Sequence, residues 1–283
     1  MVYGVLRFIN FAHSDVFMVG AYAGFFIAPY FAPRTVTGGL AVLCAAMVIC
    51  AILGVVIERL AYRPLRQSSK LNVLITAIGV SLLLENAAQL FWKATPRAFP
   101  VLFPTATYRF NTGSETVNQV AHAQTVTISS NQIIVLAVTL FLLIALQFLV
   151  FKTKMGKAMR AVSFNHTAAS LVGISNDKVI SFTFALGSAL AAAGGILYAI
   201  NYQSIQPLMG IMPGLKAFVA AVLGGIGNIP GAAVGGLILG IVETFVKGSP
   251  WSTFSDAIAF AVLILILVFR PAGLFGKVQV EKV

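Results

Sequence analysis

The chain has 283 residues, of which 59% are hydrophobic and only 10% are charged. Soluble domains contain roughly 45–50% apolar and about 25% charged residues, so this composition excludes an ordinary soluble protein and indicates an integral membrane protein. The formal net charge of +11 first suggests a nucleic-acid ligand. However, the lysines and arginines gather in connections between apolar stretches, as topology signals do. We therefore expect a lipid bilayer as the partner of this surface, and no nucleic acid.

Seven apolar blocks follow one another, each near or above the roughly 20 residues that a helix needs to cross a bilayer. They cover residues 16–33, 36–57, 71–92, 132–151, 179–200, 217–246 and 251–269. The sixth block has 30 residues and an interior that reads "GGIGNIPG", which a continuous helix tolerates poorly. It is therefore either two short helices joined by a turn or one kinked helix.

The basic residues decide between these alternatives, because cytoplasmic connections attract lysine and arginine. The basic connections hold Arg59, Arg63, Arg66 and Lys70; Lys152, Lys154, Lys157, Arg160 and Lys178; and Arg270, Lys277 and Lys282. The long stretch 93–131 has few basic residues and is expected outside, as a short hairpin or a segment along the membrane surface. The carboxyl tail reaches the inner side only if the sixth block crosses twice. The sequence predicts an all-α polytopic transmembrane helical bundle with about eight crossings, two of them short, and both termini inside.

Motifs for catalysis are not visible in the sequence. Gly156-Lys157 is followed by alanine and lacks the glycine spacing of a phosphate loop. The three histidines and two cysteines form no metal-ligand pattern. We therefore expect neither an enzyme nor a cofactor in this chain.

Several stretches, in this order, resemble the permeases of branched-chain amino acid ABC importers, and the LivH-type subunit fits best. They are "LRFINFAHSDVFMVGAY" (6–22), "AYRPLR" (61–66), "LITAIGVSLLLEN" (74–86), "MGKAMRAVSFNHTAASLVGI" (155–174), "AAAGGILYAI" (191–200) and "FVAAVLGGIGNIPGAAVGGLILGIVE" (218–243). The resemblance covers nearly the whole chain and implies a single transmembrane permease domain over residues 1–283 with the ABC importer permease fold. Relatives usually have another apolar helix before the part that matches Tyr3, so we expect this chain to lack that helix.

The resemblance also implies the rest of the machine. It comprises a second related permease subunit, two cytoplasmic ATPase subunits that use the ATP, and a soluble substrate-binding protein outside. The chain would lie in the cell inner membrane and translocate branched-chain or related amino acids by alternating access. Two alternatives stay open: the same type of importer carrying urea, short amides or other small polar solutes, and a stand-alone channel or secondary transporter.

Residues 152–178 correspond to the cytoplasmic coupling loop of such permeases. Asn165 is placed to cap a short helix over 167–172, and Gly173 is placed to end it. Ala161, Ala168 and Ala169 present little bulk to a groove in an ATPase. The expected coupling residues are Gly156, Arg160, Ala161, Asn165, Ala168, Ala169 and Gly173. The alternative is a merely solvated basic loop.

A substrate path is predicted from polar residues at membrane depth. The stretch 7–15 interrupts the apolar pattern and contains Asn10 and His13, so it is either a broken helix near the path or a loop at the membrane boundary. Glu85 and Asn86 lie inside the third block, where a carboxylate is costly. Glu85 either binds the amino group of a substrate, or is a neutral acid or a structural partner for a helix terminus.

Overall fold

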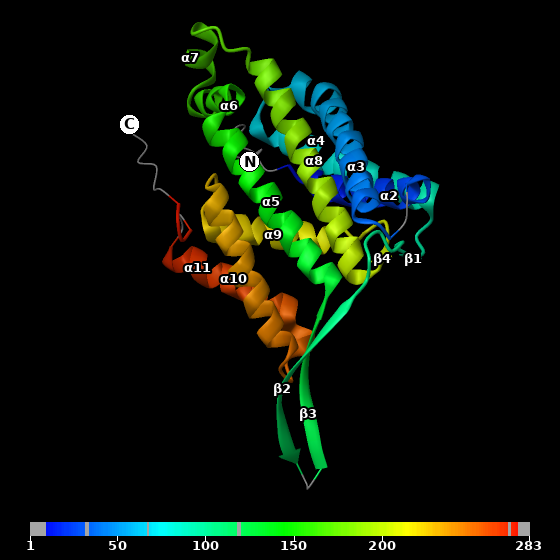
Figure 1. Ribbon diagram of the computed structural model, residues 1–283. Coiled ribbons are helices and arrows are strands. Elements are labelled where there is room, and N and C mark those ends of the chain that lie inside the picture. Colours follow the sequence, from blue (N-terminus) through cyan, green and yellow to red (C-terminus); the bar gives the residue numbers. More distant parts are fainter. Residues whose placement is uncertain (1–9, 32–33, 67, 118–119, 271–272, 277–283) are drawn as a thin grey trace.

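The computed structural model describes residues 10–31, 34–66, 68–117, 120–270 and 273–276. These residues form a bundle of helices from which one long β-hairpin projects (Figure 1). The bundle helices are α2 (His13–Ile27), α3 (Val36–Ile57), α4 (Lys70–Trp92), α5 (Ser130–Lys152), α8 (Asn176–Tyr202), α9 (Ile211–Gly224), α10 (Ile229–Lys247) and α11 (Ser255–Phe269). The predicted helical membrane bundle is therefore confirmed.

Shorter elements connect these helices. The helical turns are η1 (Ala28–Tyr30), η2 (Glu58–Tyr62), η3 (Arg63–Leu65) and η4 (Ser252–Phe254), and the segment between α5 and α8 contains α6 (Lys154–Phe164) and α7 (His166–Leu171). The strands are β1 (Arg97–Ala98), β2 (Thr107–Val117), β3 (Val120–Ser129) and β4 (Ser204–Ile205). β2 pairs antiparallel with β3, and β1 with β4. The stretch 93–131 thus contains a hairpin, and it is longer than the sequence led us to expect.

The described part of the chain has eight bundle helices, in the positions of the eight predicted crossings. Five of them, α3, α4, α5, α8 and α10, are long and apolar enough to cross a membrane. The other three are α2 with 15 residues, α9 with 14 and α11 with 15. Three helices rather than two are therefore short. α2 is short because it ends at Ile27, where a 3₁₀ turn containing Pro29 takes over. The expectation of a missing helix before Tyr3 lies outside the described residues.

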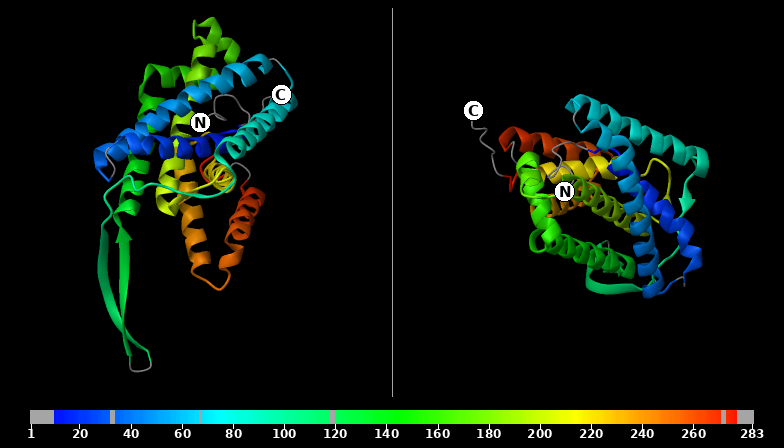
Figure 2. Two further views of the ribbon diagram at one scale, coloured as in Figure 1. Left: turned by 90° about the vertical axis from the view of Figure 1, so that its right-hand side faces the viewer. Right: turned by 90° about the horizontal axis from the view of Figure 1, so that it is seen from above.

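The sixth apolar block folds as two helices, α9 and α10, joined by a turn, and not as one kinked helix. Their turn lies beside the chain that follows α11, because Leu274 N donates to Leu223 O at 2.8 Å and Asn228 Nδ2 donates to Phe275 O at 3.2 Å. The turn and the carboxyl-terminal segment therefore share one end of the bundle. We call the end that holds η2, η3, α6, α7 and residues 273–276 the basic end, and the opposite one, with β1 to β4, the hairpin end (Figures 1 and 2).

α8 is the central helix. In its 18-residue apolar stretch 67% of the residues are buried inside the protein, compared with 6% in the same length of α5. α2 and α3 pack against it through small residues. A Cβ atom on Gly195 would lie 2.1 Å from Phe17 O, and one on Gly20 would lie 2.3 Å from Ala192 Cα. In lipid, small residues of this kind let helix backbones approach closely, and the resulting van der Waals contacts hold the helices together.

This packing makes a prediction about stability. Gly195→Ala should lower the unfolding free energy by about 1–3 kcal/mol, because its methyl group would overlap the backbone of α2. Gly79→Ala is the matched control, since a Cβ atom at Gly79 on α4 has open space within 4 Å. Equilibrium unfolding of the purified protein in mixed micelles measures both. Equal stability of the two variants would contradict the close approach of α2 and α8.

Candidate functional site

The segment between α5 and α8 begins with a sharp turn at the basic end. Thr153 Oγ1 donates to Leu149 O at 2.6 Å and accepts from Gly156 N at 3.1 Å, so one side chain bonds to the last turn of α5 and the first turn of α6. A Cβ atom on Gly156 would lie 2.2 Å from Val150 O. Gly156 is therefore buried in the α5–α6 corner, where it sets the direction of α6 rather than offering a surface to a partner.

The short helix predicted after Asn165 is present. Asn165 Oδ1 accepts from Ala168 N at 3.0 Å, so this residue is the N-cap. Gly173 has φ of 83°, and the following amide, Ile174 N, donates back to Ala169 O at 3.0 Å. This left-handed residue ends α7 as the sequence predicted. α7 spans His166–Leu171, one residue earlier than expected.

Ala169 does not lie on the outer face of α7, as the small-residue interpretation required. It is only 3% exposed and packs with Met159, Val162 and Val179 in a small apolar cluster. Ala169 faces inward because this cluster is the support of α7, so it cannot contact another protein directly. Ala168 is exposed.

The outer surface of the segment also carries large apolar side chains that were not predicted from the sequence. Phe164 is 86% exposed, Leu171 83% and Val172 76%. We call these three side chains the apolar tip; Phe164 ends α6, Leu171 ends α7 and Val172 follows it. They could have been found from the sequence, because they are large apolar residues within a polar, basic segment. Arg160 lies apart from them, with its guanidinium 5.2 Å from the centre of the Phe151 ring, and Ala161 is half-buried.

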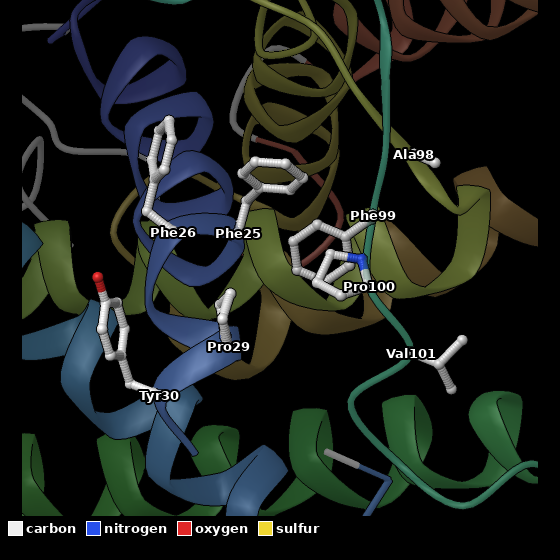
Figure 3. Close-up of a pocket in the computed structure, with 8 residues that line it drawn as sticks. All are labelled: Phe25, Phe26, Pro29, Tyr30, Ala98, Phe99, Pro100 and Val101. Atoms are coloured by element: carbon white, nitrogen blue, oxygen red, sulfur yellow. The ribbon is translucent and has the colours of Figure 1, made fainter. Parts of the chain in front are cut away.

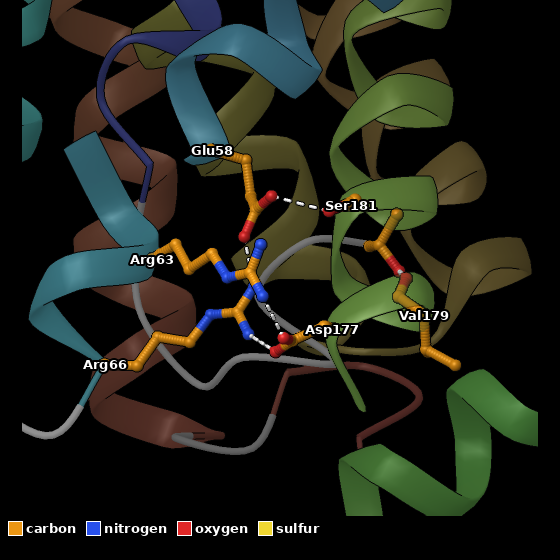
Figure 4. Close-up of polar contacts among 7 residues, drawn as sticks. Glu58, Arg63, Arg66, Asp177, Val179 and Ser181 are labelled. Carbon is orange, nitrogen blue, oxygen red and sulfur yellow. Dashed lines mark hydrogen bonds and ion pairs between the residues drawn. The ribbon is translucent and has the colours of Figure 1, made fainter. Parts of the chain in front are cut away.

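A network of ion pairs joins the end of α3 to the start of α8 (Figure 4). Glu58 is fully buried; it pairs with Arg66 and accepts from Ser181 Oγ at 2.6 Å. Arg66 also reaches Asp177 at 2.5 Å, and Arg63 pairs with the other oxygen of Asp177. Arg63 and Arg66 both come from the "AYRPLR" stretch, and their pairing with residues 58 and 177 was not predicted from the sequence.

The network reaches the coupling segment directly. Asp177 is the second residue of α8, and its neighbour Asn176 donates from Nδ2 to His166 O at 2.9 Å. α7 is thus bonded to the first turn of α8, which is ion-paired to η3 and, through Arg66, to buried Glu58. A displacement of α7 therefore has a continuous polar route to α3.

The residues predicted for a substrate path do not converge. Asn10 accepts from the Tyr62 hydroxyl at 2.6 Å near the basic end, and His13 is exposed on the surface. Asn86 is exposed on α4, where its Nδ2 donates to Leu82 O at 2.7 Å on its own helix. Glu85 is half-buried on that helix, and within the described residues no side-chain hydrogen bond joins any of the four to another.

Glu85 does have a partner region inside the bundle. Ser81, one turn earlier on α4, donates to Asp15 Oδ2 at 2.5 Å, and Glu85 is close enough to interact with Asp15. Asp15 is 1% exposed, so its side chain is buried inside the bundle. The Ser81–Asp15 hydrogen bond joins α4 to α2 one turn from Glu85, which favours a structural role for Glu85.

A cavity of about 520 Å³ opens at the hairpin end, between the end of α2 and the chain after β1 (Figure 3). Its lining is apolar and aromatic, and consists of Phe25, Phe26, Pro29, Tyr30, Ala98, Phe99, Pro100 and Val101. None of the predicted path residues lines it.

Comparison with known proteins identifies the family of this chain. Residues 1–267 match the model of the family described as branched-chain amino acid transport system / permease component. The chain belongs to this permease family. It is 39% identical over 287 residues to the BraD permease protein of Pseudomonas aeruginosa, covering 100% of this chain and 91% of BraD.

Two further relatives extend the likeness. The LivH permease protein of Escherichia coli K12 is 40% identical over 289 residues, covering 100% of this chain and 90% of LivH. LivH of Salmonella typhimurium is 39% identical over 287 residues, with the same coverage. All three relatives are named as high-affinity branched-chain amino acid transport system permease proteins. No solved structure matches.

The ion-pair network of this permease makes a second prediction. Arg66→Met should lower the unfolding free energy by about 3–5 kcal/mol, because it leaves the buried Glu58 carboxylate without a cation. Arg63→Met is the matched control and should cost about 0–1 kcal/mol, since Arg63 and Asp177 are half-exposed. Unfolding in mixed micelles measures both.

The double variant Glu58→Gln with Arg66→Met removes the charge and its partner together, so it should recover most of the lost stability. An Arg66→Met variant no less stable than Arg63→Met would show that Arg66 does not neutralise Glu58.

Proposed function

We propose that this chain is the membrane-spanning permease subunit of an ABC importer that translocates branched-chain or related amino acids by alternating access. The observation that carries the proposal is the match to the permease family along nearly the whole chain. The proposal includes a second related permease subunit, two cytoplasmic ATPase subunits that use the ATP, a soluble binding protein outside, and a location in the cell inner membrane. The chain itself would need no cofactor and catalyse no reaction.

In this proposal the basic end faces the cytoplasm, and residues 152–178 form the loop on which an ATPase subunit acts. The apolar tip supports this role. Phe164, Leu171 and Val172 are almost fully exposed at a position that lies outside the membrane if the basic loops are cytoplasmic. Exposed large apolar groups grouped on a surface mark an interaction site. The bonds from α7 to α8 and on to Glu58 offer a route by which docking reaches the membrane helices.

The transport proposal is tested by uptake of labelled L-leucine into vesicles that contain the complete transporter. Unlabelled isoleucine and valine should compete, whereas urea and acetamide should not. Uptake should require ATP inside and the binding protein outside. Competition by urea or acetamide as strong as that by valine would favour an importer for small polar solutes.

The docking surface makes a third prediction. Leu171→Ser should weaken association with the ATPase subunits roughly tenfold to a hundredfold, because burying a large apolar side chain contributes about 1.5–3 kcal/mol. ATPase co-purification and leucine uptake should fall together while the permease reaches the membrane in normal amount. Ser170→Ala is the control, since Ser170 is exposed beside Leu171 and its hydroxyl donates only to Thr167 O on its own helix.

Substitutions at the two alanines separate docking from folding of the segment. Ala168→Arg adds bulk on the exposed side of α7 and should reduce docking. Ala169→Arg should instead disrupt α7 itself, since that position is buried. Full association by both Leu171→Ser and Ala168→Arg would refute the loop as the ATPase contact.

Sidedness makes a fourth prediction, tested with single cysteines in a background that lacks Cys44 and Cys50. A cysteine at Ser170, at the basic end, should resist an impermeant thiol reagent applied from outside intact cells. One at Thr105, an exposed residue at the hairpin end, should react. The reverse pattern would place the basic end outside and remove the basis for ATPase docking there.

A further inference from the structure

A cluster of four charged side chains lies at the hairpin end of α9, α10 and α11. Lys216 Nζ contacts Glu243 Oε1 at 2.9 Å and Asp256 Oδ1 at 2.7 Å. Lys247 Nζ contacts the same Glu243 oxygen at 2.6 Å. These four residues belong neither to the coupling segment nor to the predicted substrate path.

The four groups divide by exposure. Lys216 and Glu243 are mostly buried, with side chains 22% and 15% exposed. Lys247 and Asp256 are half-exposed, at 49% and 43%. The buried pair therefore holds in place an outer pair that consists of one ammonium and one carboxylate.

All four residues lie near the same end of the bundle, the hairpin end. Lys216 is in the second turn of α9, which follows β4, and β4 pairs with β1 at the hairpin end. Glu243 and Lys247 are in the last turns of α10, and Asp256 is in the first turn of α11. If the basic end is cytoplasmic, the cluster lies at the outer side of the membrane, where a substrate enters.

The outer pair matches the charged part of a free amino acid. The three contacts in series bound the separation of Lys247 Nζ and Asp256 Oδ1 at about 8 Å. This value is an upper limit, and an α-amino acid that makes one hydrogen bond from its ammonium and one to its carboxylate spans up to roughly the same distance, so one molecule can bridge the pair. No hydrogen bond or ion pair to the second oxygen of Asp256 is present within the described part of the chain, so this oxygen has capacity for a ligand ammonium.

We propose that Lys247 and Asp256 bind the α-carboxylate and α-ammonium of an amino acid entering from the outer side, with Lys216 and Glu243 holding the two in position. This inference rests on the proposed function and adds the chemical class that the site accepts. A zwitterion brings one positive and one negative group, so every charge of the cluster and of the ligand keeps an opposite charge as its partner. An uncharged solute cannot do so, because it would leave charges of the cluster poorly paired beside the membrane.

Ligand binding to the unaltered protein is the first test. The permease, co-purified with its partner subunits but without the binding protein, is placed in nanodiscs, and saturation-transfer NMR measures its affinity for L-leucine. N-acetyl-L-leucine lacks the ammonium, L-leucinamide lacks the carboxylate, and 4-methylpentanamide lacks both charges. We expect each to bind at least tenfold more weakly than L-leucine, since each forfeits a charge-assisted hydrogen bond. Empty nanodiscs correct for partition into lipid. Equal binding of 4-methylpentanamide and L-leucine would overturn the proposal.

Substitutions test which charged group of the ligand each of the two side chains binds. Asp256→Asn should reduce the preference for L-leucine over N-acetyl-L-leucine tenfold or more, whereas Lys247→Gln should reduce the preference over L-leucinamide. Lys247→Arg keeps the charge and should restore that second preference. Lys93→Gln, at an exposed lysine at the end of α4, is the control and should change neither. Loss of stability without a change in either preference would show that the cluster only joins the three helices.

The two proposals fail in different ways. If the complete transporter with its binding protein takes up no amino acid, the proposed function is wrong. If it takes up L-leucine but the nanodisc-held complex does not prefer the zwitterion, only the binding role of Lys247 and Asp256 is wrong.

Discussion

The close approach of α2 and α3 to α8 is the constraint on which the rest of this structure depends. Lipid is as apolar as the side chains it would replace, so the hydrophobic effect gives these helices little reason to associate. Contact between backbones replaces it, and Gly20 and Gly195 make that contact possible. Because α8 is thereby fixed at the centre, its first turn is held where η3 and α7 can bond to it.

The same placement explains how costly charges are tolerated. Glu58 is fully buried at the end of α3, yet it lies opposite Ser181 and within reach of Arg66 because α3 and α8 pack side by side. Leaving this carboxylate unpaired would be strongly destabilising. At the hairpin end, Lys216 meets Glu243 and Asp256 only because α9, α10 and α11 converge there. Both polar clusters are consequences of helix packing, and each lies near one end of the bundle.

The sequence predicted the helices well because apolar length and basic loops are strong signals in membrane proteins. Residues 36–57 form α3 with the predicted bounds, and the "GGIGNIPG" stretch is the turn that the distribution of charge required. Local capping rules also sufficed for Asn165 and Gly173, since a cap depends on neighbouring residues alone. Orientation and long-range pairing could not be predicted. Helical spacing alone does not show that Ala169 faces inward, and nothing in "AYRPLR" shows that Arg66 meets residues 58 and 177.

The pairing of β1 with β4 has a mechanical consequence. It joins the chain that leaves α4 to the chain that leaves α8 at the hairpin end, while the bridges from Arg63 and Arg66 tie the α3–α4 connection to α8 at the basic end. The unit formed by α3, α4 and α8 is thus connected at both the hairpin end and the basic end, which opposes sliding of these helices past one another. α9 to α11 continue from it through residues 206–210 and touch α2 where a Cβ atom on Gly210 would lie 2.0 Å from Ser14 O. The two groups of helices therefore meet at a seam so close that residue 210 has no room for a side chain.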